Sequence, residues 1–339
     1  MLMKPTYKFS IIIPFFNAEL YLEDAVESVI QQKKINFCKD VQVILINDGS
    51  DDNSEKIVEK YLNKYPNNIK YIKQKNSGVS SARNIGMQYA EGEYLNFLDA
   101  DDKLSDNSLN KVSMFFDKYE KYIDVVSIPL YFFEGKSESH ILNYKFDKDE
   151  IIDIEEKFEY IQMSISGTFI KRTSIQGYKF REELKYGEDA YLITQIILKK
   201  RKYGIIRGAK YFYRYRTNMS STMQNSWQNK QWFLDSVWIL IPELKKLYEI
   251  NNGLKYIQYI ILYDLSWKIS IGKRAKNTLS KKEWGVFLSE VQNILGVIDN
   301  DVILRYGRLN IRNMIIIYFI KYIRFQKITS LCTKIIWGA

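Results

Sequence analysis

Apolar residues in the first hundred positions gather in four short runs, and the segments between the runs have helical spacing. The runs predict strands at Phe9–Ile13, Val41–Ile46, Ile69–Ile72 and Tyr94–Leu98. In the segment Tyr21–Gln32, apolar residues recur every three or four positions, as on one face of a helix. Strands that alternate with helices of this length predict a parallel, doubly wound α/β layer with right-handed crossovers.

The turn after the first strand contains no glycine. It is Pro14-Phe15-Phe16-Asn17-Ala18-Glu19, and we expect Pro14 to end the strand because proline cannot donate to a ladder. A dinucleotide site would need Gly-x-Gly-x-x-Gly here, because the backbone must approach the pyrophosphate closely. The sequence therefore argues against a dehydrogenase or an ordinary methyltransferase.

The fourth strand ends in three carboxylates, those of Asp99, Asp101 and Asp102. Ligands of parallel sheets bind at the carboxyl ends of the strands. Acids so close together repel one another unless a positive charge is bound, and Mg²⁺ or Mn²⁺ is commonly shared between carboxylates and a diphosphate. The alternative is a solvated acidic turn ahead of the next helix, where Ser105 and Asp106 resemble helix-start residues.

Size and composition limit the class of protein. A chain of 339 residues that is 46% hydrophobic can bury a large core, and we expect two domains, residues 1–225 and 226–339. The two cysteines, Cys38 and Cys332, form no disulfide framework, which fits a reducing compartment. The sequence has no secretory signal at its start and no uninterrupted apolar run of about 18 residues. We therefore expect a cytoplasmic protein.

The sequence contains a single histidine, His140. Its scarcity argues against histidine-based zinc sites and a Ser-His-Asp triad, and its polar neighbours suggest a surface position. The chemistry must then rest on carboxylates, hydroxyls, basic residues and a metal.

The last third of the chain is helical in pattern and basic. From Asp301 to Ala339 there are seven Lys or Arg residues and one acid, a net charge of +6. The segment Met314–Phe325 is rich in Ile, Tyr and Phe but is interrupted by charges, a composition that suits the surface of an anionic membrane. The alternative is a C-terminal helix packed on its own domain. No motif indicates nucleic acid as a partner.

Six motifs, in order, resemble those of family 2 glycosyltransferases with the GT-A fold, over about residues 8–225. They are Ser10–Asn17, Asn47-Asp48-Gly49-Ser50, Ser80–Gly86, Leu98–Asp102, Gly187-Glu188-Asp189 and Tyr213-Arg214-Tyr215-Arg216. The resemblance implies an enzyme that transfers a sugar from a nucleotide-diphosphate donor with inversion at the anomeric carbon. Enzymes of this type serve bacterial capsule and exopolysaccharide synthesis, so the resemblance implies a saccharide or lipid-linked saccharide acceptor.

The resemblance also implies a role for individual residues. Phe16 would stack on the base, Asp48 would accept a hydrogen bond from the imide of uracil or thymine, Asp99 would contact the ribose, and Asp101 would hold Mn²⁺ or Mg²⁺. Asn47 departs from the pattern, since it replaces the first of two acids. The full set expected at the donor is Pro14, Phe16, Asn17, Glu19, Asp48, Asn76, Arg83, Asp99, Asp101, Arg214, Arg216 and Ser220, with Asp101 and Asp99 as the candidate metal ligands.

The acid pair Glu188-Asp189 precedes an apolar helix. Its structural interpretation is favourable charge at a helix N-terminus. The resemblance instead implies that Asp189 is the general base for the acceptor hydroxyl and that Glu188 orients its neighbours.

Two other interpretations remain open at this stage. One is a degenerate GT-A module that binds a nucleotide sugar without turnover, although all the expected acids are present. The other is a nucleotidyltransferase, which normally has a glycine-rich basic loop after the first strand. The residues do not identify the sugar, the acceptor or the linkage.

Overall fold

The computed structural model describes residues 6–216, 225–271, 278–307 and 311–322. The chain divides into two compact units, and both are discontinuous in sequence. Unit 1 comprises residues 1–153, 162–182 and 192–217, and unit 2 comprises residues 154–161, 183–191 and 218–339. The division at residue 225 stays a proposal.

Unit 1 contains all the named strands. The strands are β1 (Tyr7–Phe15), β2 (Val41–Asn47), β3 (Ile69–Lys73), β4 (Gly92–Phe97), β5 (Lys103–Leu104), β6 (Val125–Ser127), β7 (Leu130–Glu134), β8 (Glu150–Asp153), β9 (Thr168–Lys171), β10 (Lys202–Ile205) and β11 (Tyr211–Tyr215). The α-helices that precede unit 2's C-terminal segment are α1 (Leu22–Ile30), α2 (Phe37–Asp40), α3 (Ser54–Lys64), α4 (Val79–Gln88), α5 (Ser108–Tyr119), α6 (Arg172–Ile175) and α7 (Glu188–Ile197). A 3₁₀-helix spans Ile141–Lys145.

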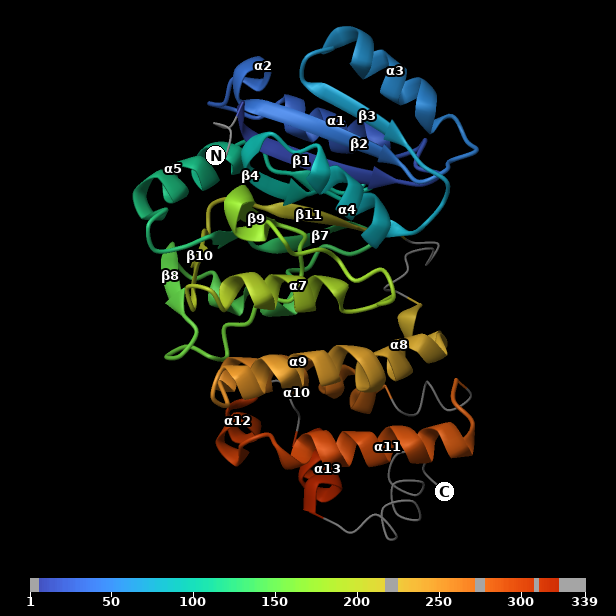
Figure 1. The fold of residues 1–339 in the computed structure, drawn as a ribbon, viewed down its shortest axis with the longest axis vertical. Coiled ribbons are helices and arrows are strands. Elements are labelled where there is room, and N and C mark those ends of the chain that lie inside the picture. Colours follow the sequence, from blue (N-terminus) through green and yellow to red (C-terminus); the bar gives the residue numbers. More distant parts are fainter. Residues whose placement is uncertain (1–5, 217–224, 272–277, 308–310, 323–339) are drawn as a thin grey trace. The chain divides into compact units, whose positions relative to one another are not determined.

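The main sheet has the strand order β3-β2-β1-β4-β9-β6-β10-β8 (Figure 1). Its first four strands are mutually parallel, as expected from the four apolar runs. Strand β9 runs antiparallel to both β4 and β6, and β8 runs antiparallel to β10. The sheet is therefore mostly parallel at the end that carries the acidic turn, and mixed beyond it.

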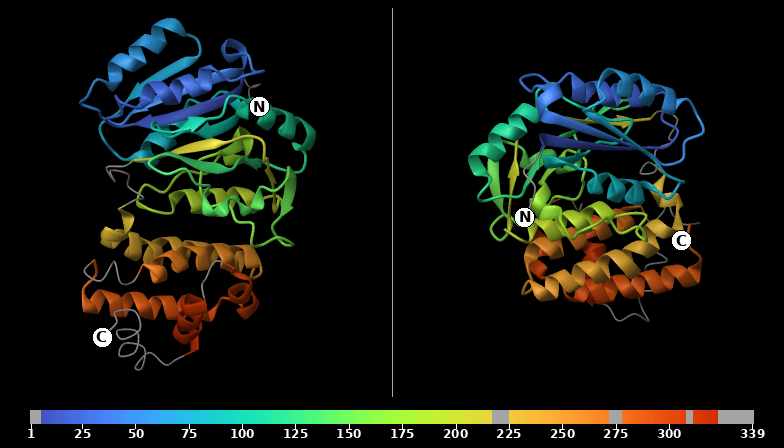
Figure 2. Two further views of the ribbon diagram at one scale, coloured as in Figure 1. Left: turned by 180° about the vertical axis from the view of Figure 1, so that it is seen from behind. Right: turned by 45° about the horizontal axis from the view of Figure 1, so that its top comes forward.

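Helices cover both faces of the parallel part, as Figures 1 and 2 show in three views. Ile11 and Ile13 belong to a core cluster with the apolar side chains of α1. Ile12 points the other way, toward α4, where a Cβ atom on Gly86 would lie 2.4 Å from Ile12 Cγ2. Burial on both sides explains why these strands have no polar alternation.

Strand β1 continues through Pro14 to Phe15, so the expectation that Pro14 ends it is wrong. The ladder to β4 ends where Ile12 pairs with Phe97, and the N–H of Leu98 donates to the Ile12 carbonyl at 3.0 Å. The backbone polar groups of Pro14 are directed toward β4, as those of Ile12 are, but Pro14 lies beyond the last pair of residues in this ladder. No N–H group is therefore needed at Pro14. On the other side, β2 still holds the strand, since the Asp48 N–H donates to the Phe15 carbonyl at 2.8 Å.

A second sheet has the order β5-β11-β7. The strand-like segment Ile123–Phe133 divides at Ile128 and Pro129, so that β6 belongs to the main sheet and β7 to the small one. Strand β11 pairs antiparallel with β5, which directly follows the acidic turn. This pairing places β11 beside the turn.

The C-terminal segment of unit 2 is helical. Its helices are α8 (Lys230–Asp235), a π-helix (Ser236–Leu240), α9 (Ile241–Ile250), α10 (Lys255–Ser270), α11 (Lys281–Gly296), α12 (Asn300–Arg305) and α13 (Ile311–Tyr322), after a 3₁₀ turn at Ser226–Gln228. Helix α10 is buried around most of its circumference, and Phe233, Trp284 and Phe287 pack edge-to-face within the unit. Among the described residues, no helix combines the length and hydropathy that a membrane span requires.

Two of the basic residues after position 301 have partners inside unit 2. Arg305 lies over the ring of Phe158 at 5.4 Å, and Lys321 Nζ donates to the Ile298 carbonyl at 2.6 Å. Of the others, Arg308, Arg324, Lys327 and Lys334 lie outside the described residues.

Candidate functional site

The strands β1, β2 and β4 are parallel neighbours, so their carboxyl ends meet at one edge of the main sheet. Three segments leave the sheet there, after Phe15, Asn47 and Phe97. They carry half of the residues that the sequence predicts for the donor, namely Phe16, Asn17, Glu19, Asp48, Asp99 and Asp101. This edge is where ligands of parallel α/β sheets bind.

The acidic turn begins with Asp99, which lies against α4. Arg83 is 4% exposed, and its Nη2 atom lies 2.9 Å from Asp99 Oδ1. Ser166 Oγ lies 3.5 Å from the other carboxylate oxygen. The guanidinium group of Arg83 also lies over the ring of Phe180, at 5.3 Å. Asp99 is thus held between α4 and the segment before β9.

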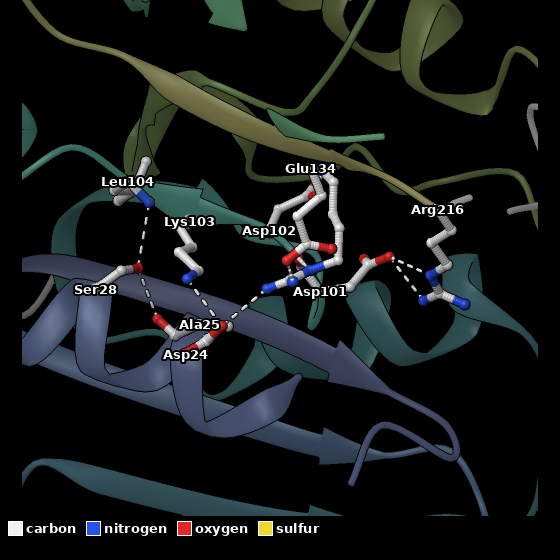
Figure 3. A network of polar contacts seen from close by, with 10 residues as sticks. Asp24, Ala25, Ser28, Asp101, Asp102, Lys103, Leu104, Glu134 and Arg216 are labelled. Atoms are coloured by element: carbon white, nitrogen blue, oxygen red, sulfur yellow. Dashed lines mark hydrogen bonds and ion pairs between the residues drawn. The ribbon is translucent and has the colours of Figure 1, made fainter. Parts of the chain in front are cut away.

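Asp101 pairs with Arg216, just after β11. Arg216 Nε and Nη2 lie 2.9 and 2.7 Å from Asp101 Oδ2, and Figure 3 shows the two side chains pointing toward each other. Burial raises the pKa of Asp101, the positive charge of Arg216 opposes that rise, and the negative charge of Asp99 adds to it. Arg216 is thus the cation paired with Asp101.

Asp102 is 1% exposed and faces the interior. Its Oδ2 atom accepts a hydrogen bond from the Tyr211 hydroxyl at 2.7 Å, and its Oδ1 atom accepts one from the Arg214 backbone N–H at 2.8 Å. Burial raises its pKa well above the usual value, and the charges of Asp101 and Asp99 raise it further. The structure thus ties Asp102 to β11.

Asp48, after β2, accepts three hydrogen bonds. Gln74 Nε2 and the Ser77 N–H donate to Oδ1 at 2.6 and 2.7 Å, and the Gly78 N–H donates to Oδ2 at 2.9 Å. A carboxylate has about four acceptor positions, so Oδ2 retains one for a further donor. Asn76 lies beside Gly49, where an added Cβ would approach the Asn76 nitrogen to 2.9 Å.

Asn47, which stands in place of an acid, is fully buried. Its Nδ2 donates to the Tyr71 hydroxyl at 3.0 Å, which in turn donates to Glu55 at 2.6 Å. Its Oδ1 accepts from the Ser50 N–H at 2.7 Å. An aspartate here would place a second buried carboxylate beside Asp48, and the amide removes that repulsion.

The loop after β1 presents one aromatic ring to solvent. Phe16 is 51% exposed, whereas the neighbouring Phe15 and Pro14 are buried. Asn17 has a positive φ of 48°, and its Oδ1 accepts from the Asp51 N–H at 3.0 Å.

Glu19 joins the same loop to the start of α3, because its Oε2 accepts from both the N–H and the Nδ2 of Asn53 at 2.9 Å. Asn17 and Glu19 therefore shape the loop from within.

Glu188 and Asp189 begin α7 and are partly buried. They follow Gly187, whose φ of 86° favours glycine and whose added Cβ would meet Leu240 Cδ2 at 2.5 Å. These acids belong to unit 2, whereas the acidic turn belongs to unit 1. Ser220 lies outside the described residues.

Four residues of this region were not singled out from the sequence: Asp24, Glu134, Gln74 and Tyr211. Each contacts a site residue in the folded structure, but none of the four lies in one of the six sequence motifs. A usable signal existed only for Tyr211, which begins the aromatic and basic segment Tyr211–Arg216.

The candidate metal ligands can be tested against the contacts around them. Asp102 is committed to β11 and Asp99 to Arg83, so Asp101 is the carboxylate best able to exchange its partner. Within the described ranges, no group of three His, Cys, Asp or Glu side chains forms a closed metal cage. One or two carboxylates completed by phosphate oxygens and water are a ligand set that Mg²⁺ accepts. The donor set therefore fits a divalent ion that binds together with a diphosphate.

The fold is that of the GT-A class. The crystal structure of Staphylococcus aureus TarS 1–349 in complex with UDP-GlcNAc has a TM-score of 0.73 with this chain, at 18% identity, and the match covers 98% of this chain and 92% of that one. A structure of TarS 1–349 with UDP has a TM-score of 0.70. These likenesses confirm the predicted fold.

Residues 10–180 match the model of glycosyl transferase family 2, and the chain belongs to this family. It is 44% identical over 303 residues to the minor teichoic acid biosynthesis protein GgaB of Bacillus subtilis, and this match covers 88% of the chain and 33% of GgaB. It is 36% identical over 301 residues to GgaA of the same organism, and this match covers 86% of the chain and 67% of GgaA. The chain thus spans a third of one relative and about two thirds of the other.

Proposed function

We propose that this protein is a metal-dependent, inverting glycosyltransferase that moves a sugar from a UDP-sugar to a hydroxyl group of a cell-surface polysaccharide. The observation that carries the proposal is that Phe16, Asp48 and the acidic turn meet at one sheet edge, in a chain of glycosyl transferase family 2. The names of the relatives support this class of acceptor, since GgaB and GgaA are named for teichoic acid biosynthesis.

The uridine end of the donor binds at the loops after β1 and β2. The exposed ring of Phe16 stacks on uracil, and Asp48 accepts the imide N–H at its remaining acceptor position. Because three donors already fix the Asp48 carboxylate, little conformational entropy is lost when the base binds. Asp99, held by Arg83, contacts the ribose.

The diphosphate end binds at Asp101 and Arg216. Asp101 would hold the divalent ion, and Arg216 would exchange the Asp101 carboxylate for diphosphate oxygens, a pairing for which its planar group is suited. When bound, the ion stabilises the negative charge of the departing diphosphate.

Asp189 acts as the general base. The acceptor hydroxyl oxygen forms a bond to the anomeric carbon, the bond from that carbon to UDP breaks, and UDP leaves with the electron pair. The hydroxyl proton passes to the Asp189 carboxylate, without which the hydroxyl is a poor nucleophile. Glu188 orients neighbouring polar groups.

The test is a panel of nucleotide sugars with Mn²⁺ or Mg²⁺, scored for binding, hydrolysis and transfer. Asp189→Asn keeps the size of the side chain and removes the proton acceptor, so transfer should fall about 10²–10⁴-fold while UDP affinity stays the same. Glu188→Gln is the matched variant, and we expect a smaller loss. Binding without any turnover by the wild-type protein would instead identify a nucleotide-sugar-binding module.

We also propose that the protein works in the cytoplasm, at the inner surface of the membrane. The basic composition after Asp301 supports this location, and the internal contacts of Arg305 and Lys321 weaken the support. Sedimentation of the full chain with anionic vesicles at low salt tests it. Failure to sediment would reject the membrane contact and leave the catalytic proposal intact.

A further inference from the structure

Arg214 lies in β11 and Arg216 directly follows this strand, but their surroundings differ. The side chain of Arg214 is 4% exposed, whereas that of Arg216 is 27% exposed. Arg216 contacts the carboxylate of Asp101, and Arg214 contacts its backbone. The two arginines therefore have different roles.

The guanidinium group of Arg214 binds three elements at once. Its Nε donates to the Asp101 carbonyl at 2.8 Å, its Nη2 pairs with Asp24 of α1 at 2.9 Å, and its Nη1 pairs with Glu134 at the end of β7. Figure 3 shows this network between α1 and the small sheet. The backbone N–H of Arg214 adds the hydrogen bond to Asp102.

Aromatic rings and a second cation enclose the same group. The Arg214 guanidinium carbon lies 4.8 Å from the ring centroid of Tyr21 and 4.6 Å from that of Phe133. Lys103 Nζ shares Asp24 with Arg214, at 2.8 Å. Burial alone would raise the pKa of Asp24, but the hydrogen bonds from Lys103 and Arg214 lower it below its usual value. Arg214 thus contacts two aromatic rings in addition to its polar partners.

We propose that Arg214 is a positioning residue for the acidic turn and not a ligand of the donor. It fixes the Asp101 carbonyl from one side and Asp102 from the other, and so sets the direction in which the Asp101 carboxylate points. Phosphate binding would require the 4% exposed Arg214 to leave two carboxylates, a carbonyl and two rings, whereas Arg216 is 27% exposed and contacts one of the three acids of the turn and the ring of Tyr21. The inference rests on the proposed function, because it concerns the binding of metal and diphosphate.

The expected effect of changing Arg214 on ligand binding follows from the candidate metal ligand that the acidic turn carries. Residues that orient a metal ligand typically contribute 10–100-fold to metal affinity. Uridine reaches Phe16 and Asp48 on other loops and, through its ribose, Asp99, which is held by Arg83 and Ser166 and not by Arg214. Loosening the turn should therefore weaken metal-dependent UDP binding and leave uridine binding unchanged.

The experiment compares Arg214→Lys with Arg207→Lys in the full-length protein. Lysine keeps the charge but cannot reach Asp24, Glu134 and the Asp101 carbonyl together. Arg207 is the matched control, because its guanidinium also binds a backbone carbonyl, that of Asp147 at 3.0 Å, in the same unit. UDP affinity is measured by calorimetry with Mn²⁺ and with EDTA, uridine affinity by ligand-observed NMR, and folding by the thermal midpoint.

We expect Arg214→Lys to weaken UDP binding in Mn²⁺ about 10–100-fold, with uridine affinity within about twofold of wild type. Arg207→Lys should change neither. An equal loss for uridine and UDP would indicate a general structural role, and a comparable loss for UDP in EDTA would indicate a direct phosphate contact. Either result, or no change at all, overturns the proposal.

If Arg214→Lys does not fold, Asp24→Asn decides by the same criteria. It removes one partner of Arg214 from a side chain that is 48% exposed, so the fold should tolerate it. A smaller loss in the same direction supports the positioning role, and unchanged metal-dependent UDP affinity rejects it. Wild-type protein that binds no UDP would reject the proposed function itself, a result that neither variant can mimic.

Discussion

Phe16 offers the sharpest test of the donor site, because its ring is exposed for no evident structural reason. The side chain is 51% exposed, and the adjacent Phe15 is 3% exposed and part of the core. Truncation of an exposed side chain usually changes stability by less than about 0.5 kcal/mol. Any loss of binding in Phe16→Ala can therefore be assigned to the ligand contact.

The size of the loss can be estimated from base stacking. A base on an aromatic side chain contributes about 1–3 kcal/mol, so Phe16→Ala should weaken UDP binding about 5- to 150-fold. The stack involves the base alone, so uridine should lose as much as UDP. Phe16→Tyr keeps the ring and should restore wild-type affinity.

The assay is calorimetric titration of UDP, with uridine measured by ligand-observed NMR. Tyr122→Ala is the matched control, since this aromatic side chain is 61% exposed but follows α5, away from the loops after β1 and β2. Unchanged uridine affinity in Phe16→Ala would refute the stacking role. A fall in the thermal midpoint as large as that of Phe15→Ala would show that Phe16 serves the core.

Three further predictions concern the counter-ion, the sheet and the helical segment. Arg216→Gln removes the cation from Asp101, so the affinity for Mn²⁺ alone should rise while the affinity for UDP falls. Titrations of Mn²⁺ without nucleotide and of UDP measure the two affinities. If both rise or both fall, Arg216 does not exchange Asp101 for the diphosphate. Gly92→Ala would place Cβ 2.4 Å from the Ser10 nitrogen, a backbone atom that cannot move aside. It should lower the free energy of unfolding, measured with denaturant, by about 1–3 kcal/mol. In the control Gly285→Ala the added Cβ meets no atom within 4 Å, so the free energy of unfolding should not change. The hydrogen bond from Lys230 contributes most, and those from Ser280 contribute less, to lowering the pKa of Glu283 from 4.5 to about 2. The stabilisation that Glu283 provides is therefore present above pH 4.5 and is lost as the pH falls toward 2. Glu283→Gln should flatten this part of the curve of stability against pH.

The parallel half of the fold could be predicted because its signals are local. The apolar runs of β1, β2 and β4 reflect burial on two faces, and the helical spacing between the runs reflects burial on one face, so each segment carries its signal in its own residues. Pro14 misled the prediction, since its effect depends on where the ladder to β4 ends, and that depends on the pairing of residues far apart in the chain, such as Ile12 with Phe97. The division of Ile123–Phe133 between two sheets depends likewise on distant partners.

The candidate site was predictable to the extent that motifs carry it. The acids of the turn and the acid after β2 were found by their position at strand ends, and their roles stay predictions. The sequence could not separate Arg214 from Arg216, because alternation along a strand assigns both to one face. The contacts that distinguish the buried Arg214 come from elsewhere in the chain, among them the carboxylates of Asp24 in α1 and Glu134 in β7.

The discontinuous division of the chain limits how such proteins can recombine. Residues 154–161 and 183–191 belong to unit 2 although unit 1 surrounds them in sequence, and Phe158 packs against Tyr259 at 6.1 Å between ring centroids. A gene fusion or exchange with a single junction near residue 225 would therefore separate these segments from their packing partners. Shuffling of the C-terminal helices among relatives should succeed only when the two short inserts travel with them, so the helices and the inserts should be inherited as one module.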